Sequence, residues 1–215
     1  MRNRYFALRD GRDYGIDLLR IVAMLMVVVL HVLGHGGVFG AKELSGANYW
    51  SAWFLNIACY CAVDIYALIS GFVGYRVKHG YAGIAELWLR VALYSVSFAA
   101  LYCILFPSEA GRLRLLFSFF PATRGELWYF TMYFGLFFLM PVLNAAVQAM
   151  PEKLLRNTVV ASVFLFCVLP FLWNRDTFYL KHGYSLIWLL VLYLVGAYIG
   201  KYRAFEKMNR AAALL

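Results

Sequence analysis

Long apolar runs alternate with short polar connections along this chain. Each run is close to the ~20 residues that a helix needs to cross a bilayer. The runs cover residues 16–34, 52–73, 86–106, 127–147, 158–174 and 185–200. Apolar residues are nearly continuous within them and do not alternate with a period of two, which argues against strands. The pattern predicts an all-α fold, a polytopic transmembrane bundle of about six helices.

The first run carries polar residues on one face. The stretch from Gly15 to Gly37 contains Asp17, Arg20 and His31. The eleven-residue step from Arg20 to His31 is almost a whole number of helical turns, and Asp17 precedes Arg20 by about one turn. Arg20 and His31 are therefore separated by roughly 16 Å along the axis. This helix is expected to present a cation near one membrane surface and an imidazole towards the other.

Composition supports a membrane location. Of the 215 residues, 64% are hydrophobic and 14% are charged, whereas soluble domains average about 45–50% and about 25%. The net charge of +9 suggests a polyanionic partner in a soluble protein, but in a membrane protein it indicates basic cytoplasmic loops. We expect the lipid bilayer as a partner and no nucleic acid.

The basic residues predict an orientation. With the N-terminus inside, twelve Lys and Arg residues fall on inner segments and six on outer loops. This excess predicts a multi-pass protein of the cell membrane with a cytoplasmic N-terminus. Residues 1–14 form a basic cytoplasmic arm, 15–207 the transmembrane domain and 208–215 a tail. The connection over 107–126 is basic for an outer loop, and its LRLLFSFF sequence is also typical of an interfacial amphipathic helix.

The four cysteines predict neither a metal site nor a disulfide framework. They lie in apolar runs without a CxxC pair, as small buried hydrophobic residues do. A link at Cys59 or Cys61 stays open. No zinc motif or phosphate-binding glycine loop occurs in the sequence.

Asp64 falls near the middle of the second run. A charge at that depth costs at least ~2.5–3.5 kcal/mol on insertion scales, so it faces a polar cavity or a partner. One interpretation is an ion pair with Arg20 or Arg90 that ties helices together. The other is a functional site.

The polar residues of the first run also have two interpretations each. His31 is either a histidine hydrogen-bonded within the helix bundle or a functional base. His35 follows one turn later on the same face, in the same pocket or at the outer interface. Arg20 is close enough to the inner surface to extend its guanidinium into the headgroups, with Asp17 as its local partner.

Several motifs resemble one family. Arg20 and His31, ten residues apart within DLLRIVAMLMVVVLH, are similar to the Arg-x10-His signature of the integral-membrane acyltransferases of family 3, the sugar and polysaccharide O-acetyltransferases. VDIYALISGFVGYR resembles the family's next motif, with Asp64, Ser70, Gly71, Phe72 and Arg76 in place. By themselves, Ser70 and Gly71 indicate close helix packing, and Ser70 lacks the surroundings of a hydrolase nucleophile.

Two later segments extend the resemblance. Arg90 opens the third helix, where the family often has basic residues. LWYFTMYFGLFFLMPVLN, with Trp128 and Pro141, resembles the family's fourth-helix motif. Tyr133 and Phe134 stand where many members carry acidic residues, which suggests the surface-polysaccharide branch. The family usually has about ten helices, so the resemblance implies a C-terminally truncated member.

The resemblance implies a reaction and a set of site residues. An acetyl group moves from acetyl-coenzyme A, a substrate and not a permanently bound cofactor, to a sugar hydroxyl of a polysaccharide or glycolipid. His31 takes the hydroxyl proton, Arg20 meets the donor, and Asp64 orients the imidazole or stabilises its charged form. The residues expected to bind substrate or donor are Asp17, His35, Ser70, Arg76, Arg90 and Trp128.

Two alternatives remain at this stage. A transporter or flippase would use the same buried charges as a substrate path, and inverted repeats or broken helices, which are not evident in the sequence, would favour it. An inactive remnant of an acyltransferase is the other alternative. The sequence does not indicate an oligomeric state.

Overall fold

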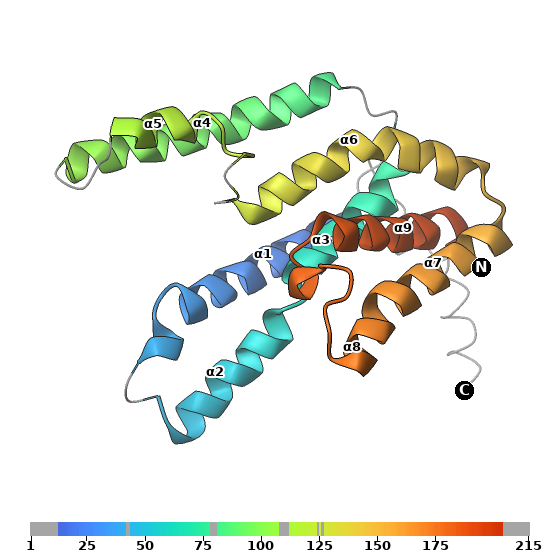
Figure 1. Ribbon diagram of the computed structural model, residues 1–215, viewed down its shortest axis with the longest axis horizontal. Helices are drawn as coiled ribbons and strands as arrows, with labels where there is room; N and C mark the ends of the chain where they lie inside the picture. The colour runs from blue at the N-terminus through green and yellow to red at the C-terminus, as the bar shows by residue number, and fades with distance from the viewer. Residues whose placement is uncertain are drawn as a thin grey trace. The chain divides into compact units, whose positions relative to one another are not determined.

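The computed structural model describes residues 13–41, 44–77, 81–107, 112–123, 125 and 127–203 (Figure 1). Most of the predicted basic arm and the predicted tail therefore lie outside the described residues. The described part is helical and contains no strand. Five stretches are long and apolar enough to span a membrane: Tyr14–Gly40, Gly46–Gly74, Ala82–Leu105, Trp128–Ala149 and Glu152–Trp173. A shorter apolar helix covers Leu186–Tyr202. These stretches coincide with the six predicted runs and confirm the all-α fold class.

The chain divides into two compact units. Unit 1 comprises Met1–Ile69 and unit 2 comprises Ser70–Leu215. The boundary falls inside helix α3 (Ala62–Gly74). Each unit is described by itself.

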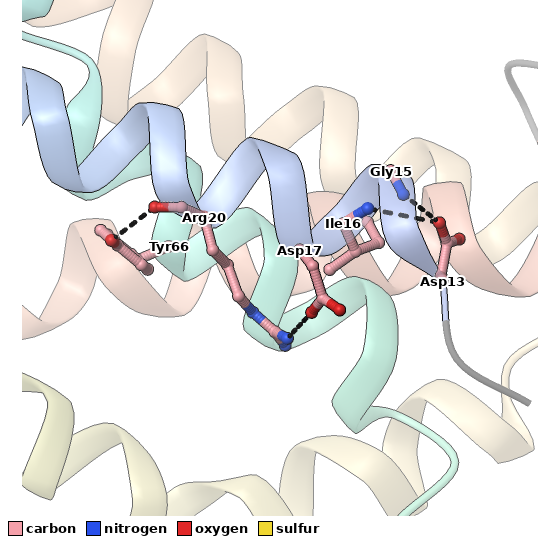
Figure 2. Close-up of polar contacts among 6 residues, drawn as sticks. All are labelled: Asp13, Gly15, Ile16, Asp17, Arg20 and Tyr66. Carbon is pink, nitrogen blue, oxygen red and sulfur yellow. Dashed lines mark hydrogen bonds and ion pairs between the residues drawn. The ribbon is translucent and has the colours of Figure 1, made fainter. Parts of the chain in front are cut away.

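The described part of unit 1 begins with a capped helix. Its elements are α1 (Tyr14–Gly34), the short 3-10 helix η2 (Val38–Gly40), α2 (Gly46–Cys59) and the first half of α3. The Asp13 carboxylate accepts hydrogen bonds from the backbone N–H groups of Gly15 (2.9 Å) and Ile16 (3.3 Å) (Figure 2). These N–H groups have no partner within the helix, so an aspartate at this position sets the start of α1. Helices α1 and α2 then pack side by side (Figure 1).

The second run is interrupted, which the sequence analysis did not predict. It was expected as one helix over 52–73, but α2 ends at Cys59 and α3 begins at Ala62. The Tyr60 N–H bonds the Ile57 carbonyl, three residues back, at 3.3 Å. A bond to the third residue back tightens the last turn and ends the α-helical pattern. The interruption places a helix N-terminus within the apolar run.

Unit 2 is built around its last helix. Its further elements are α4 (Ala82–Leu105), α5 (Arg112–Ser118), α6 (Trp128–Ala149), α7 (Glu152–Val163), η3 (Phe164–Val168), α8 (Leu169–Trp173), η4 (Lys181–Gly183) and α9 (Leu186–Tyr202). Helix α9 packs against α6 and α7 (Figure 1), and its Tyr193 is fully buried.

Helix α5 lies where the LRLLFSFF segment favoured a helix. Its interfacial location stays a prediction.

One proline explains an irregularity of the fifth apolar stretch. The segment η3 is a π-helical turn between α7 and α8, and Pro170 follows it. Proline has no N–H and its ring clashes with the carbonyl four residues back, so a widened turn accommodates it without ending the helical stretch.

Helices α3 and α9 approach so closely that glycine is required at the contact. A Cβ atom on Gly71 would lie 2.0 Å from the Tyr193 carbonyl oxygen, and one on Gly200 would lie 2.6 Å from the Phe72 carbonyl oxygen. Both obstacles are backbone atoms that cannot rotate away. This confirms the prediction that the small Ser70-Gly71 pair serves close helix packing.

The C-terminal ends of α3, α6 and α9 meet at one end of unit 2. The Lys201 ammonium group donates hydrogen bonds to three carbonyls at the C-terminal end of α6: Val147 (2.6 Å) and Gln148 (3.3 Å) in its last turn, and Met150 (2.8 Å) directly after it. The Tyr75 hydroxyl, at the end of α3, donates to the Gly200 carbonyl at 3.1 Å. The last carbonyls of a helix lack partners within it and carry partial negative charge. A lysine is therefore well suited to join these ends.

Replacing Lys201 with Met is expected to lower the free energy of unfolding by about 3 kcal/mol, because bonds to a charged donor are lost while the carbonyls remain partly buried. Thermal unfolding in detergent, followed by tryptophan fluorescence, measures the loss. Lys153→Met is the matched control, since Lys153 is exposed at the start of α7. Equal midpoints for the two variants would contradict the capping role of Lys201.

Candidate active site

The predicted ion pair on the first helix is present. The Arg20 guanidinium lies 3.2 Å from the Asp17 carboxylate, one turn earlier on α1 (Figure 2). The Arg20 side chain is 45% exposed and that of Asp17 is 23% exposed. A half-exposed pair of this kind contributes little to stability. The pair orients the guanidinium and uses one of its N–H donors; within the described residues, the other donors have no side-chain acceptor.

Tyr66 joins α3 to α1 beside this pair. Its hydroxyl donates a hydrogen bond to the backbone carbonyl of Arg20 at 2.9 Å (Figure 2). The two residues are 46 positions apart in the sequence, so this bond holds α3 against α1 at Arg20, near the start of the polar face. Tyr66 was not predicted as a site residue, because no charge or motif distinguishes it from other tyrosines in the apolar runs.

The two histidines of α1 lie side by side. The rings of His31 and His35 have centroids 5.4 Å apart, as their one-turn spacing predicts. The His31 Nδ1 atom is 2.8 Å from the Val27 carbonyl oxygen. A carbonyl only accepts hydrogen bonds, so Nδ1 carries the proton. The neutral imidazole consequently has its lone pair on Nε2, and the side chain is exposed.

Asp64 lies in the first turn of α3, immediately after the interruption of the second run. A helix N-terminus carries partial positive charge, which stabilises a carboxylate there. Its side chain is half-buried. The interruption thus supplies a physical reason why an ionised residue is tolerated near the middle of an apolar run.

Ser70 contacts an aromatic row in unit 2. Its hydroxyl lies 3.4 Å from the Tyr133 hydroxyl on α6, and the Tyr133 ring stacks on Tyr129 with a centroid distance of 5.9 Å. The Trp128 ring, at the start of α6, contacts Tyr184 at 4.3 Å. Tyr133, which stands where the resemblance led us to expect an acidic residue in many family members, is therefore the partner of Ser70.

The two other predicted arginines differ in their surroundings. Arg90 pairs with Glu86, one turn earlier on α4, at 2.7 Å, and both side chains are largely exposed. Arg76 follows α3, donates from Nε to the Tyr75 hydroxyl, and lies over the Tyr75 ring at 5.0 Å. Among the described residues, no side chain forms a hydrogen bond or ion pair with the terminal amino groups of Arg76.

Sequence reasoning missed two polar residues of unit 2. Asn144 and Tyr193 are hydrogen-bonded to each other at 2.6 Å between α6 and α9. Asn144 is 5% exposed. A single amide within an apolar run is a signal that could have identified Asn144, since buried polar groups are paired.

Cysteine and metal-ligating residues are dispersed in the described part of the chain. No group of three or more His, Cys, Asp or Glu residues is arranged to hold a metal ion there. The cysteines are free thiols: Cys59, Cys61, Cys103 and Cys167.

Comparison with known proteins gives one match. A family model described as an acyltransferase domain, family 3, matches residues 13–215. Neither the curated proteins nor the solved structures contain a significant match. The matched region includes the polar face of α1, the interrupted second run and the Ser70-Gly71 contact. With its membrane-spanning helices, the chain belongs to the acyltransferase 3 family of membrane acyltransferases.

Proposed function

We propose that the protein is an O-acyltransferase that moves an acetyl group from acetyl-coenzyme A to a sugar hydroxyl of a cell-surface polysaccharide or glycolipid. The sugar oxygen attacks the thioester carbonyl, a C–O bond forms and the C–S bond breaks. The hydroxyl proton passes to a base and then to the departing thiolate. The products are the acetylated sugar and free coenzyme A.

The contact between His31 Nδ1 and the Val27 carbonyl oxygen is the observation that carries this proposal. With its Nδ1 proton held by the Val27 carbonyl, the exposed imidazole presents an unprotonated Nε2. A base needs such a nitrogen within reach of the hydroxyl. The hydrogen bond also fixes the ring's orientation, as the third group does in other base-assisted transfers.

Three further residues of unit 1 have proposed roles in this chemistry. Arg20 has N–H donors beyond the one used by Asp17. Because Arg20 lies roughly 16 Å from His31 along the axis of α1, these donors are proposed to bind a phosphate group of the acyl donor and not the reacting carbonyl. Because Val27 already holds Nδ1, the role proposed for Asp64 is stabilisation of the charged imidazolium. His35, beside His31, is proposed to contact the acceptor.

The donor is proposed to bind at the end of unit 2 where α3, α6 and α9 terminate. Arg76 is exposed there, and α7 begins nearby with the exposed residues Lys153 and Arg156. The excess of basic residues on this side argues that it faces the cytoplasm, where acyl-coenzyme A is found. Its phosphate groups are suited to guanidinium donors. Arg90 and Ser70 remain proposed donor or substrate contacts.

The acceptor is proposed to bind at the opposite end of α6. Trp128 and Tyr184 form a pair of rings there, and aromatic rings combine a large apolar face with a polar edge. This suits a sugar ring, because its C–H groups can pack on the apolar face of the aromatic ring and its hydroxyls can form hydrogen bonds at the polar edge. The residues of the pair are partly exposed.

One observation favours a transporter as the second candidate. Discontinuous helices are typical of transporter sites, and the second run is interrupted between α2 and α3. The two functions differ in their products, because a transporter moves its substrate without consuming acyl-coenzyme A.

The test uses the full chain in lipid nanodiscs with [14C]acetyl-coenzyme A and isolated cell-envelope glycan. The expected result is labelled glycan and free coenzyme A thiol in equal amounts, both absent from empty nanodiscs. Movement of an unmodified glycolipid across proteoliposomes, without release of thiol, would instead support the transporter.

A further inference from the structure

The turn that carries Arg76 is held in place by side chains of α6. We define the Arg76 turn as residues 74–77. The Asn144 amide donates one hydrogen bond to the Gly74 carbonyl at 2.9 Å and another to the Val77 carbonyl at 3.1 Å. The Gln148 amide donates to the Tyr75 carbonyl at 3.1 Å. Every backbone carbonyl of the turn except that of Arg76 itself is therefore bound by α6.

Asn144 is suited to hold this turn in one geometry. It is 5% exposed, and it lies on the buried face of α6 among apolar residues. Its amide hydrogens are both used, and its oxygen accepts a 2.6 Å hydrogen bond from the Tyr193 hydroxyl. Because Tyr193 holds the oxygen from α9, the amide nitrogen must face α3. Reversing the amide would leave buried groups unpaired, which costs ~1–3 kcal/mol each.

The guanidinium of Arg76 is oriented by the same turn. The Tyr75 hydroxyl donates its proton to the Gly200 carbonyl and so accepts from Arg76 Nε. The terminal amino groups of Arg76 have no side-chain partner within the described residues, and the side chain is exposed. A planar guanidinium held from its Nε side presents a fork that matches two oxygens of a phosphate group.

We infer that Asn144 is a positioning residue: it fixes the Arg76 turn so that the Arg76 guanidinium is preorganised for a phosphate group of the acyl donor. This inference rests on the proposed function for the nature of the ligand. Ordering a flexible side chain on binding costs about 0.5–1.5 kcal/mol, which a fixed turn avoids. The benefit of Asn144 therefore depends on the presence of Arg76.

A double-mutant cycle tests this dependence. The dissociation constant of coenzyme A is measured on the full chain in nanodiscs for wild type, Asn144→Ala, Arg76→Ala and the double variant. Asn144→Ala is expected to weaken binding about tenfold, equivalent to ~1.4 kcal/mol. In the Arg76→Ala background the same change is expected to have no further effect. Independent losses that multiply in the double variant would overturn the inference.

Tyr193→Phe gives a milder version of the same test. It keeps the buried ring but removes the hydroxyl that orients the Asn144 amide, so a smaller loss of binding, again absent without Arg76, is expected. Ser185→Ala is the control for general destabilisation. It removes the serine that caps the start of α9 through the Trp188 N–H, at the opposite end of that helix. Binding that falls as far in Ser185→Ala as in Asn144→Ala would also overturn the inference.

Backbone exchange separates this inference from the proposed function. The Tyr75 N–H donates to the Gly71 carbonyl, before the turn, and the Val77 N–H donates to the Gly74 carbonyl, within it. Their hydrogen exchange should accelerate in Asn144→Ala and not in Ser185→Ala. If wild type fails to bind coenzyme A, the proposed donor is wrong, and the cycle is repeated with inorganic pyrophosphate. Unaccelerated exchange, or no pyrophosphate binding by wild type, would overturn the positioning role itself.

Discussion

His31→Asn is expected to reduce acetyl transfer by about 10²–10⁴-fold, the contribution of a positioned base. Asparagine keeps a polar side chain able to reach the Val27 carbonyl, but it has no basic nitrogen to replace Nε2. The structural reason is specific to this residue, because its Nδ1 proton is already engaged by that carbonyl at 2.8 Å. The initial rate of label transfer from [14C]acetyl-coenzyme A to glycan measures the effect.

The pattern of the loss separates chemistry from binding. The rate constant kcat should fall while the affinity for coenzyme A stays within about twofold, because a base acts in the transition state and contributes little to ground-state binding. His182→Asn is the control. His182 is exposed in η4 with a positive φ of 57°, which asparagine tolerates. Transfer by His31→Asn at the rate of this control would remove His31 from the mechanism.

Gly71→Ala is expected to have the largest effect on folding. The new methyl group would lie 2.0 Å from the Tyr193 carbonyl oxygen and 2.9 Å from the Ala197 nitrogen. Backbone atoms of α9 cannot rotate away, so α3 and α9 must separate. Overpacking of side chains costs about 1–3 kcal/mol. Because the obstacle here is backbone, we expect Gly71→Ala to lower the free energy of unfolding by about 3 kcal/mol or more.

Glycine 34 offers a matched control for this prediction. Gly34 ends α1, and a Cβ added there meets nothing within 4 Å. Alanine favours a helix by up to ~1 kcal/mol relative to glycine, so Gly34→Ala should be neutral or slightly stabilising. The yield of folded protein and the thermal midpoint in detergent are the measurements. A Gly71→Ala variant as stable as Gly34→Ala would mean that the close approach of α3 and α9 does not exist in solution.

Local spacing was sufficient to predict several features of the candidate site. Asp17 and Arg20 pair across one helical turn, and the rings of His31 and His35, also one turn apart, lie side by side. Such contacts follow from 3.6 residues per turn and need no other element. Arg90 was one candidate partner of Asp64, but it pairs with Glu86, one turn earlier on the same helix; the same spacing rule identifies this pair.

The interruption at Tyr60 shows where periodicity is insufficient. The apolar run is continuous through this position, so hydrophobicity alone predicts one helix. The α-helical pattern breaks where the Tyr60 N–H bonds the Ile57 carbonyl, three residues back, and no proline or glycine marks the site. The consequence for Asp64 is considerable, since it changes from a charge in mid-helix to a carboxylate at a helix N-terminus.

By itself, the sequence determined the all-α membrane fold, the position of the apolar stretches and the polar face of α1, because these depend on composition and on the period of a single helix. Only the tertiary structure decided which of the polar residues meet. The bond from Tyr66 to Arg20 and the hold of Asn144 on the Arg76 turn join residues 46 and about 70 positions apart. Such pairs depend on which helices pack together and at what height. The spacing of residues within one helix does not indicate which other helix it packs against, or at what height.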